Sequence, residues 1–227
     1  MHAFLPDSAL TIARLFALLA VEFITGFGLQ YVKPSRGIQF RAWVLVVAAT
    51  LIAHWITLTS SPGFRMLGLI AALFLGMKAV VGVNVRAEDG TVLPLARWFA
   101  FTAGWPGMRP GIFTGHPKPR KGFLKLSVQG FLCAVAGASL MLVAGPVWRQ
   151  THSSFIVTIF FFIGSSLLVH YGFFTLMAAF WRSRGFDCGP LFQNPLPSEN
   201  LGDFWGRRWN LPFHEMTAVA VYRPLAN

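Results

Sequence analysis

FIVTIFFFIGSSLLVHYGFFTLMAAF, residues 155–180, decides the fold class of this protein. The stretch contains no Lys, Arg, Asp or Glu, and an α-helix of about 20 apolar residues is long enough to cross the ~30 Å hydrocarbon core of a bilayer. Comparable apolar runs occupy residues 9–29, 42–58, 66–85 and 123–148. Helices satisfy their own backbone hydrogen bonds in lipid, whereas a lone strand does not. The sequence therefore predicts an all-α, polytopic membrane protein, with these five transmembrane helices in a single membrane domain over residues 1–227.

The composition supports a membrane protein and sets its orientation. Of the 227 residues, 55% are hydrophobic and only 12% are charged, which is more apolar surface than a soluble domain of this size can bury. Basic residues favour cytoplasmic loops. With the N-terminus outside, the outer turns hold only Arg65 and Arg149 of the basic residues that lie clearly outside the spans. The C-terminus is then cytoplasmic, and the net charge of +11 follows from this rule and from contact with anionic membrane lipids rather than from nucleic-acid binding.

Two long cytoplasmic loops, residues 86–122 and 181–227, are where we expect function, because long ordered loops usually carry it. In the first, basic residues alternate with the aromatic residues Trp98, Phe99, Phe101, Trp105 and Phe113, which suits an interfacial amphipathic helix. In the second, Asn200 is a candidate helix N-cap with Asp203 three residues on. An α-helix from there would place Phe204 above Arg208 and Trp205 above Trp209. A second helix would begin at Pro212, with Glu215 facing the positive end of its dipole.

The second loop also contains DFWGRRWN, residues 203–210, after the proline-rich PLFQNPLPSENL at 190–201. This block resembles the signature of the wax synthase-like branch of the membrane-bound O-acyltransferase family. The resemblance extends more loosely from Trp98, through GWPGM at 104–108, to YRPL at 222–225. Residues before about 90 match the family only in hydropathy.

The resemblance implies acyl transfer from acyl-coenzyme A, as co-substrate, to the hydroxyl of a lipophilic alcohol at the cytoplasmic face. Asn210 corresponds to the polar member of the family's catalytic pair, and a fixed amide can stabilise the charge that builds on a thioester carbonyl. Trp205 and Trp209 correspond to residues lining the acyl-donor tunnel, with Asp203, Phe204, Arg207 and Arg208 in the same substrate-binding block. No other cofactor is implied. Basic side chains that could hold coenzyme A phosphates are Lys118, Arg120, Lys121, Arg182 and Arg184.

The sequence departs from the family in its histidines. The family's general base is a histidine in an apolar helix several tens of residues after Trp-Asn, and we expect that this sequence is a C-terminally shortened piece of a longer acyltransferase. Within it, His214 is the candidate base, while His54 and His170, inside spans, are more typical of hydrogen-bonded core residues. Glu22, also inside a span, could pair with a neighbouring helix. No metal site is expected, because HExxH fails at Ala218.

Other functions stay open at this point. A non-catalytic lipid-binding protein, or a subunit completed by a partner chain, fits the missing histidine helix. A transporter is disfavoured by the lack of an inverted repeat. Cys133 and Cys188 predict no disulfide in a reducing compartment and no nucleophile. A homo-oligomer is compatible with the sequence.

Overall fold

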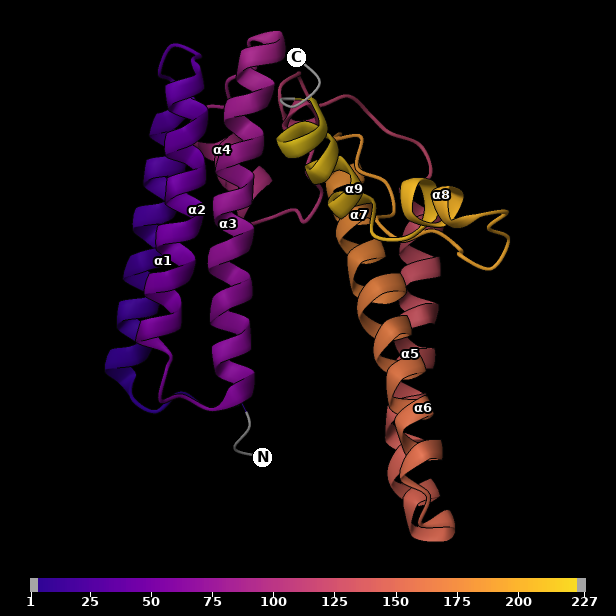
Figure 1. The fold of residues 1–227 in the computed structure, drawn as a ribbon. Coiled ribbons are helices and arrows are strands. Elements are labelled where there is room, and N and C mark those ends of the chain that lie inside the picture. Colours follow the sequence, from indigo (N-terminus) through magenta and orange to yellow (C-terminus); the bar gives the residue numbers. More distant parts are fainter. Residues whose placement is uncertain (1–3, 224–227) are drawn as a thin grey trace. The chain divides into compact units, whose positions relative to one another are not determined.

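The computed structural model describes residues 4–223, and every regular element in that range is helical (Figure 1). Five helical segments are long and apolar enough to cross a membrane, which confirms the predicted fold class. They are α1 (Ala9–Leu29), α2 (Arg36–Ile56), α3 (Pro62–Asp89), α5 (Phe123–Thr151), and a composite of α6 (Ser154–Ser166), the π-helical η3 (Leu167–Phe173) and α7 (Phe174–Ser183).

Local capping sets the ends of these helices, so they run slightly beyond the predicted apolar runs. The Ser35 hydroxyl accepts a hydrogen bond from Ile38 N–H, so α2 begins at Arg36 rather than near residue 42. Pro62 opens α3, and Gly90, with φ of 78°, closes it in the left-handed conformation that favours glycine. Apolar content therefore locates a span, and the caps decide where its helix begins and ends.

The chain forms two compact units, each described here by itself. Unit 1 comprises residues 4–114 and 215–223 of the described chain, and unit 2 comprises residues 115–214. The organisation of residues 1–227 as a single membrane domain stays a prediction. Of the expected family motifs, the last two residues of YRPL lie outside the described residues.

In unit 1, α1, α2 and α3 pack side by side as a three-helix bundle (Figure 1). Its core joins Leu15 of α1 to Ala49, Ala53 and Ala72 of α2 and α3. Small residues let the backbones approach, as is usual between transmembrane helices. A Cβ on Gly76, for example, would lie 2.7 Å from the Glu22 carboxylate and 2.9 Å from Val46.

The aromatic segment after α3 packs against this bundle through α4 (Leu95–Thr102) and the 3₁₀ turn η2 (Pro110–Phe113). Trp98, Phe101, Trp105 and Phe113 are buried, and the Trp98 indole donates to the Phe23 carbonyl of α1 at 3.2 Å. Only Phe99 of the five aromatic residues is exposed. The structure therefore differs from the expectation of rings in the headgroup region: most of this aromatic face forms the core of unit 1.

Lys78 of α3 binds the same segment through hydrogen bonds to its backbone. Its ammonium is fully buried and donates to the backbone carbonyls of Phe101, Trp105 and Gly107 at 2.8, 2.8 and 2.5 Å. The Nζ atom also lies 3.9 Å from the centre of the Phe101 ring. Carbonyl groups and an aromatic face thus stabilise this cation inside a span.

The last described residues also belong to unit 1. Glu215 forms an ion pair of 2.7 Å with Arg109 and accepts from Met108 N–H at 3.2 Å, while Asn84 donates to the Val219 carbonyl. Glu215 was expected to face the dipole of its own helix. It lies beyond the first turn of α9 (Leu211–Thr217), and its carboxylate binds Arg109 instead.

Unit 2 is a long helical hairpin of α5 against α6, η3 and α7, followed by the loop that carries DFWGRRWN (Figure 1). Glycines bring the two arms into backbone contact: a Cβ on Gly137 would lie 2.5 Å from the Gly164 carbonyl, and one on Gly172 would lie 2.9 Å from Ala134. After the hairpin come α8 (Leu201–Asp203), the π-helical η4 (Phe204–Arg208), α9, and η5 (Ala218–Tyr222), of which α9 starts in unit 2.

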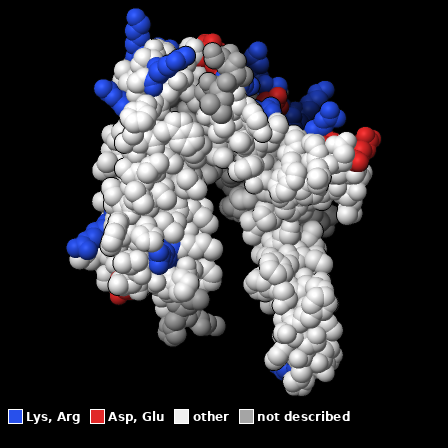
Figure 2. All heavy atoms as spheres, in the orientation of Figure 1, with Lys and Arg blue, Asp and Glu red and all other residues white. Residues whose placement is uncertain are grey.

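On the face drawn in Figure 2, most charged side chains gather at one end of each unit's helices, and a few lie toward the other end. In unit 2 they concentrate where α5 begins and α7 ends, around Asp187, which pairs with Arg182 at 2.9 Å and Arg120 at 3.6 Å. This distribution is compatible with a membrane protein whose shafts lie in lipid. The placement of the N-terminus outside and of the C-terminus in the cytoplasm remains a proposal.

Candidate functional site

The DFWGRRWN block is a capped π turn rather than a regular α-helix. Asn200 is the N-cap, as predicted, and its side chain accepts from Asp203 N–H at 2.8 Å. Over η4 the backbone bond runs from Trp209 N–H to the Phe204 carbonyl, five residues back. Residues five apart therefore become neighbours.

This geometry corrects the expected side-chain pairs. Asp203 accepts from Arg208 Nε at 2.7 Å, and Phe204 stacks on Trp209 with ring centres 5.7 Å apart and planes at 14°. The predicted α-helical pairs, Phe204 above Arg208 and Trp205 above Trp209, are wrong because the π turn changes the repeat. Trp205 is half exposed and meets Phe204 edge-on.

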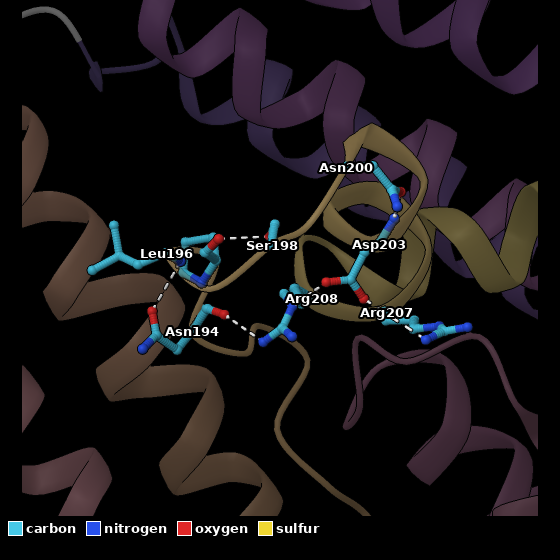
Figure 3. A network of polar contacts seen from close by, with 8 residues as sticks. Asn194, Leu196, Ser198, Asn200, Asp203, Arg207 and Arg208 are labelled. Carbon is cyan, nitrogen blue, oxygen red and sulfur yellow. Dashed lines mark hydrogen bonds and ion pairs between the residues drawn. The ribbon is translucent and has the colours of Figure 1, made fainter.

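Arg208 connects the block to the preceding proline-rich loop (Figure 3). One guanidinium group donates both to the Asp203 carboxylate and to the Asn194 carbonyl, the latter at 3.3 Å. The loop is held by its own bonds, from Leu196 N–H to Asn194 Oδ1 and from Ser198 Oγ to the Pro195 carbonyl. The hydrogen bond from Arg208 also lowers the pKa of Asp203 below its ordinary value, so the pair is charged at neutral pH.

The same loop closes one side of an apolar cavity of about 650 Å³. Gln129 and Cys133 of α5, Leu167 and Tyr171 of η3, residues 190 and 192–196 of the loop, and Trp209 are among its lining residues. A cavity of this size and character, with a few polar groups on an apolar wall, is typical of a small-molecule site. Trp209 is the member of the predicted set that lines it.

A second π turn, η3, contributes Leu167 and Tyr171 to the lining of the same cavity. Its His170 ring packs against Phe192 and Trp209, with ring centres 4.5 and 5.8 Å apart. Its Tyr171 hydroxyl donates to the Gln193 carbonyl at 3.4 Å. His170 was expected to be a hydrogen-bonded core residue, but within residues 4–223 its buried Nδ1 has no hydrogen-bond partner.

The remaining predicted site residues lie outside the cavity lining. Asn210 has a left-handed backbone, with φ of 49°, and its Oδ1 accepts from Phe213 N–H at 3.4 Å, which caps α9. Arg207 is 84% exposed and only 4.0 Å from the Asp203 carboxylate at its nearest. His214 is exposed, and its ring approaches the Cβ position of Gly206 to 3.9 Å.

The basic residues proposed for phosphate binding come from two segments that unit 2 joins. Lys118 N–H donates to the Gly185 carbonyl, and Gly185 has φ of 90° with no room for a Cβ beside Pro117. Arg120 and Arg182 share Asp187, while the Arg184 guanidinium lies 5.0 Å from the Phe180 ring. Lys121 is exposed. One carboxylate among these cations leaves the cluster net positive.

His54, Glu22 and the two cysteines were also singled out from the sequence. His54 is bonded to Arg65 at 2.9 Å, as expected of a hydrogen-bonded core histidine. Glu22 is buried beside Gly76, and its carboxylate has no hydrogen-bond partner in the described part of the chain. Cys133 and Cys188 are not joined in a disulfide. Residues 4–223 contain no group of three His, Cys, Asp or Glu able to hold a metal ion.

Phe192, Gln193 and Tyr171 were not singled out from the sequence, although all three line the cavity. For Phe192 and Gln193, the only signal in the sequence was their position in the proline-rich segment that precedes DFWGRRWN. Tyr171 lies in an apolar span, where a tyrosine carries no pattern of its own.

Comparisons with known proteins give short local similarities to two curated proteins. The chain is 42% identical over 41 residues to a long-chain-alcohol O-fatty-acyltransferase of Simmondsia chinensis. It is 44% identical over 41 residues to a probable long-chain-alcohol O-fatty-acyltransferase 6 of Arabidopsis thaliana. Each alignment covers 18% of this chain and only 12% of the relative. No protein-family model and no solved structure matches. The similarity supports a relationship to an acyltransferase family.

Proposed function

We propose that this protein is a wax synthase-like membrane acyltransferase that moves an acyl group from acyl-coenzyme A to the hydroxyl of a lipophilic alcohol. One observation carries the proposal: Trp209, which the family resemblance assigns to the acyl-donor tunnel, lines an apolar cavity of about 650 Å³. An apolar cavity holds the acyl chain and keeps water from the thioester. The local similarity to long-chain-alcohol O-fatty-acyltransferases supports the same class of reaction.

The positive cluster of unit 2 suits the other end of acyl-coenzyme A. Phosphate groups bind arginine and lysine side chains through charge-assisted hydrogen bonds. Arg120, Arg182 and Lys121 would supply such bonds, with Asp187 holding the two arginines in place until phosphates arrive. The donor would then enter from the cytoplasmic side of the membrane, where we place residues 86–122 and 181–227.

The reaction itself is a direct transfer. A histidine base takes the proton of the alcohol, the alkoxide attacks the thioester carbonyl carbon, and the C–S bond breaks to release coenzyme A. Asn210 uses Oδ1 to cap α9, which leaves its amide N–H₂ group to donate toward the reacting oxygen. His214 is the base candidate of this chain, four residues after Asn210 and beside the block at Gly206.

The test is binding of palmitoyl-coenzyme A to the purified full chain, with Trp209→Ala, Trp205→Ala and Trp148→Ala compared. Loss of an aromatic side chain that lines a binding site weakens binding by about tenfold. We expect that loss for Trp209→Ala, a smaller loss for Trp205→Ala, whose half-exposed ring lies outside the cavity lining, and little change for Trp148→Ala. The Trp148 ring, in α5, contacts His152 just beyond the end of that helix and also lies outside the cavity lining. Equal binding by all four proteins would refute the assignment of the cavity.

Activity separates the proposal from its alternative. With hexadecanol added, Asn210→Ala should abolish ester formation while protein abundance and palmitoyl-coenzyme A binding persist. Binding by the wild-type chain without any transfer would instead support a non-catalytic or partner-completed lipid-binding protein.

A further inference from the structure

One face of α2, in unit 1, carries an apolar groove of about 340 Å³ that the proposed acyl transfer does not use. We call it the α2 groove, and its lining residues are Phe40, Trp43, Val44, Val47, Ala48 and Leu51. Their spacing repeats every three or four residues, as on one face of an α-helix. Four of them are between 47% and 69% exposed. The groove is therefore open along α2, and its surroundings indicate what fills it.

Cations surround the end of the α2 groove that is nearer the start of the helix. Arg36 lies four residues before Phe40, and Arg41 lies three residues before Val44, so each arginine shares a helix face with part of the groove. Lys33 lies in the connection before α2. All three basic side chains are exposed. On the face drawn in Figure 2, basic side chains gather at this end of unit 1.

These three cations have no acidic partner in the described part of the chain. The sequence contains no Asp or Glu between Glu22 and Glu88, of which Glu22 is buried and Glu88 pairs with Arg223. The ion pairs of the described residues include none of the three. A groove on α3 differs in this respect, because the arginine in its lining, Arg65, is bonded to His54 at 2.9 Å. The α2 groove thus combines an apolar wall with unopposed positive charge at one end.

The length of the α2 groove matches one leaflet of a bilayer. At a rise of 1.5 Å per residue, Phe40 and Leu51 lie about 17 Å apart along the helix axis. That distance is about half of the ~30 Å hydrocarbon core. The arginines then lie at the headgroup level of that leaflet, where the half-buried Trp43 ring is also favoured. We place this end of α2 on the cytoplasmic side, where the leaflet is rich in anionic lipids.

We propose that the α2 groove binds an anionic phospholipid of the cytoplasmic leaflet, with an acyl chain along the groove and the phosphate paired with Arg36 and Arg41. Guanidinium groups bind phosphate oxygens through charge-assisted hydrogen bonds. An acyl chain covers the apolar wall at the same time. A helix from a second copy of the chain would cover the wall but would leave the arginines without an anion. The inference goes beyond the proposed acyl transfer and does not depend on it.

The test compares two phospholipids that have the same acyl chains and differ in headgroup charge, palmitoyl-oleoyl phosphatidylglycerol and palmitoyl-oleoyl phosphatidylcholine. Native mass spectrometry of the delipidated full chain gives the ratio of their dissociation constants. Each arginine near an anionic lipid strengthens binding about fivefold. We expect the wild-type chain to prefer phosphatidylglycerol, and Arg36→Gln/Arg41→Gln to reduce that preference roughly ten- to thirtyfold. Lys125→Gln/Arg149→Gln is the control, because it removes the same charge from exposed positions of α5 and should keep the ratio.

A second pair of variants tests the groove itself. Ala48→Trp places an indole on the exposed groove wall and should weaken binding of both lipids severalfold, whereas Ala136→Trp on an exposed position of α5 should not. A wild-type ratio in Arg36→Gln/Arg41→Gln overturns the inference. Wild-type lipid binding by Ala48→Trp would mean charge attraction without a groove and would also overturn it. A chain that binds neither lipid but forms a dimer that Ala48→Trp dissociates would assign the groove to a second copy instead.

Discussion

Replacing Lys78 with methionine should destabilise unit 1 selectively. Methionine keeps the length and most of the volume of the lysine stem, but removes the charge and the three hydrogen bonds to the Phe101, Trp105 and Gly107 carbonyls. A hydrogen bond to a charged group contributes about 1.5–3 kcal/mol, and burying the ammonium offsets part of that sum. The variant also removes the donor of three buried carbonyl oxygens, and an unsatisfied buried acceptor costs roughly 1–3 kcal/mol. We take about 3–5 kcal/mol as the expected loss.

The assay is thermal unfolding of the detergent-solubilised chain, followed by tryptophan fluorescence. Trp98 and Trp105 are buried in the segment that Lys78 holds, so they report its release. For a unit of this size each kcal/mol shifts the midpoint by a few degrees, so the variant should unfold on the order of 10 °C lower. Lys33→Met is the control, because Lys33 is exposed and the change in net charge is the same. An equal shift in both variants would refute a structural role for the buried ammonium.

Two further predictions concern unit 2. Gly137→Ala should lower the free energy of unfolding by about 1–3 kcal/mol or more, because its Cβ would meet the Gly164 carbonyl at 2.5 Å. Gly145→Ala is the control in the same helix: its Cβ would meet nothing within 4 Å, so it should raise the free energy of unfolding by up to about 1 kcal/mol. Thermal unfolding measures both. Because Arg208 lowers the pKa of Asp203, the pair stabilises the folded block above the unfolded aspartate pKa near 3.8, and this contribution is lost as pH falls through the lower folded pKa. Carbon NMR of labelled aspartate should show Asp203 titrating below 3.8 in the wild type and higher in Arg208→Gln; equal midpoints would contradict the pairing.

The membrane spans could be predicted because apolar character is a local property that is repeated along each run. Their ends were less so, since Ser35 and Pro62 extend helices into sequence that contains Arg36 and Arg65. The aromatic segment at 95–113 shows a different limit. Alternating aromatic and basic residues suit a headgroup layer and a packed layer equally well, and a lysine seventeen or more residues earlier settles the choice by binding its carbonyls.

The geometry of the candidate site was predicted only in part. Motif resemblance identified Trp209, which lines the cavity, and the N-cap at Asn200 followed from residue type alone. The pairs Asp203–Arg208 and Phe204–Trp209 did not follow, because no residue type in DFWGRRWN distinguishes a π turn from an α turn. A difference of one residue in the repeat decides which side chains meet.

The difference between the π and the α repeat also affects which histidine lies near the DFWGRRWN block. Sequence proximity favours His214, four residues from Asn210, whereas the structure brings His170, forty residues earlier than Asn210, against Trp209. That contact needs two π turns, one in the spanning helix and one in the block, and each shifts its side chains by part of a turn. Neither turn is stabilising in itself, because a π segment gives up the better α-helical hydrogen-bond geometry. The η3 turn contributes Leu167 and Tyr171 to the cavity lining, and Trp209, which lines the same cavity, directly follows the η4 turn.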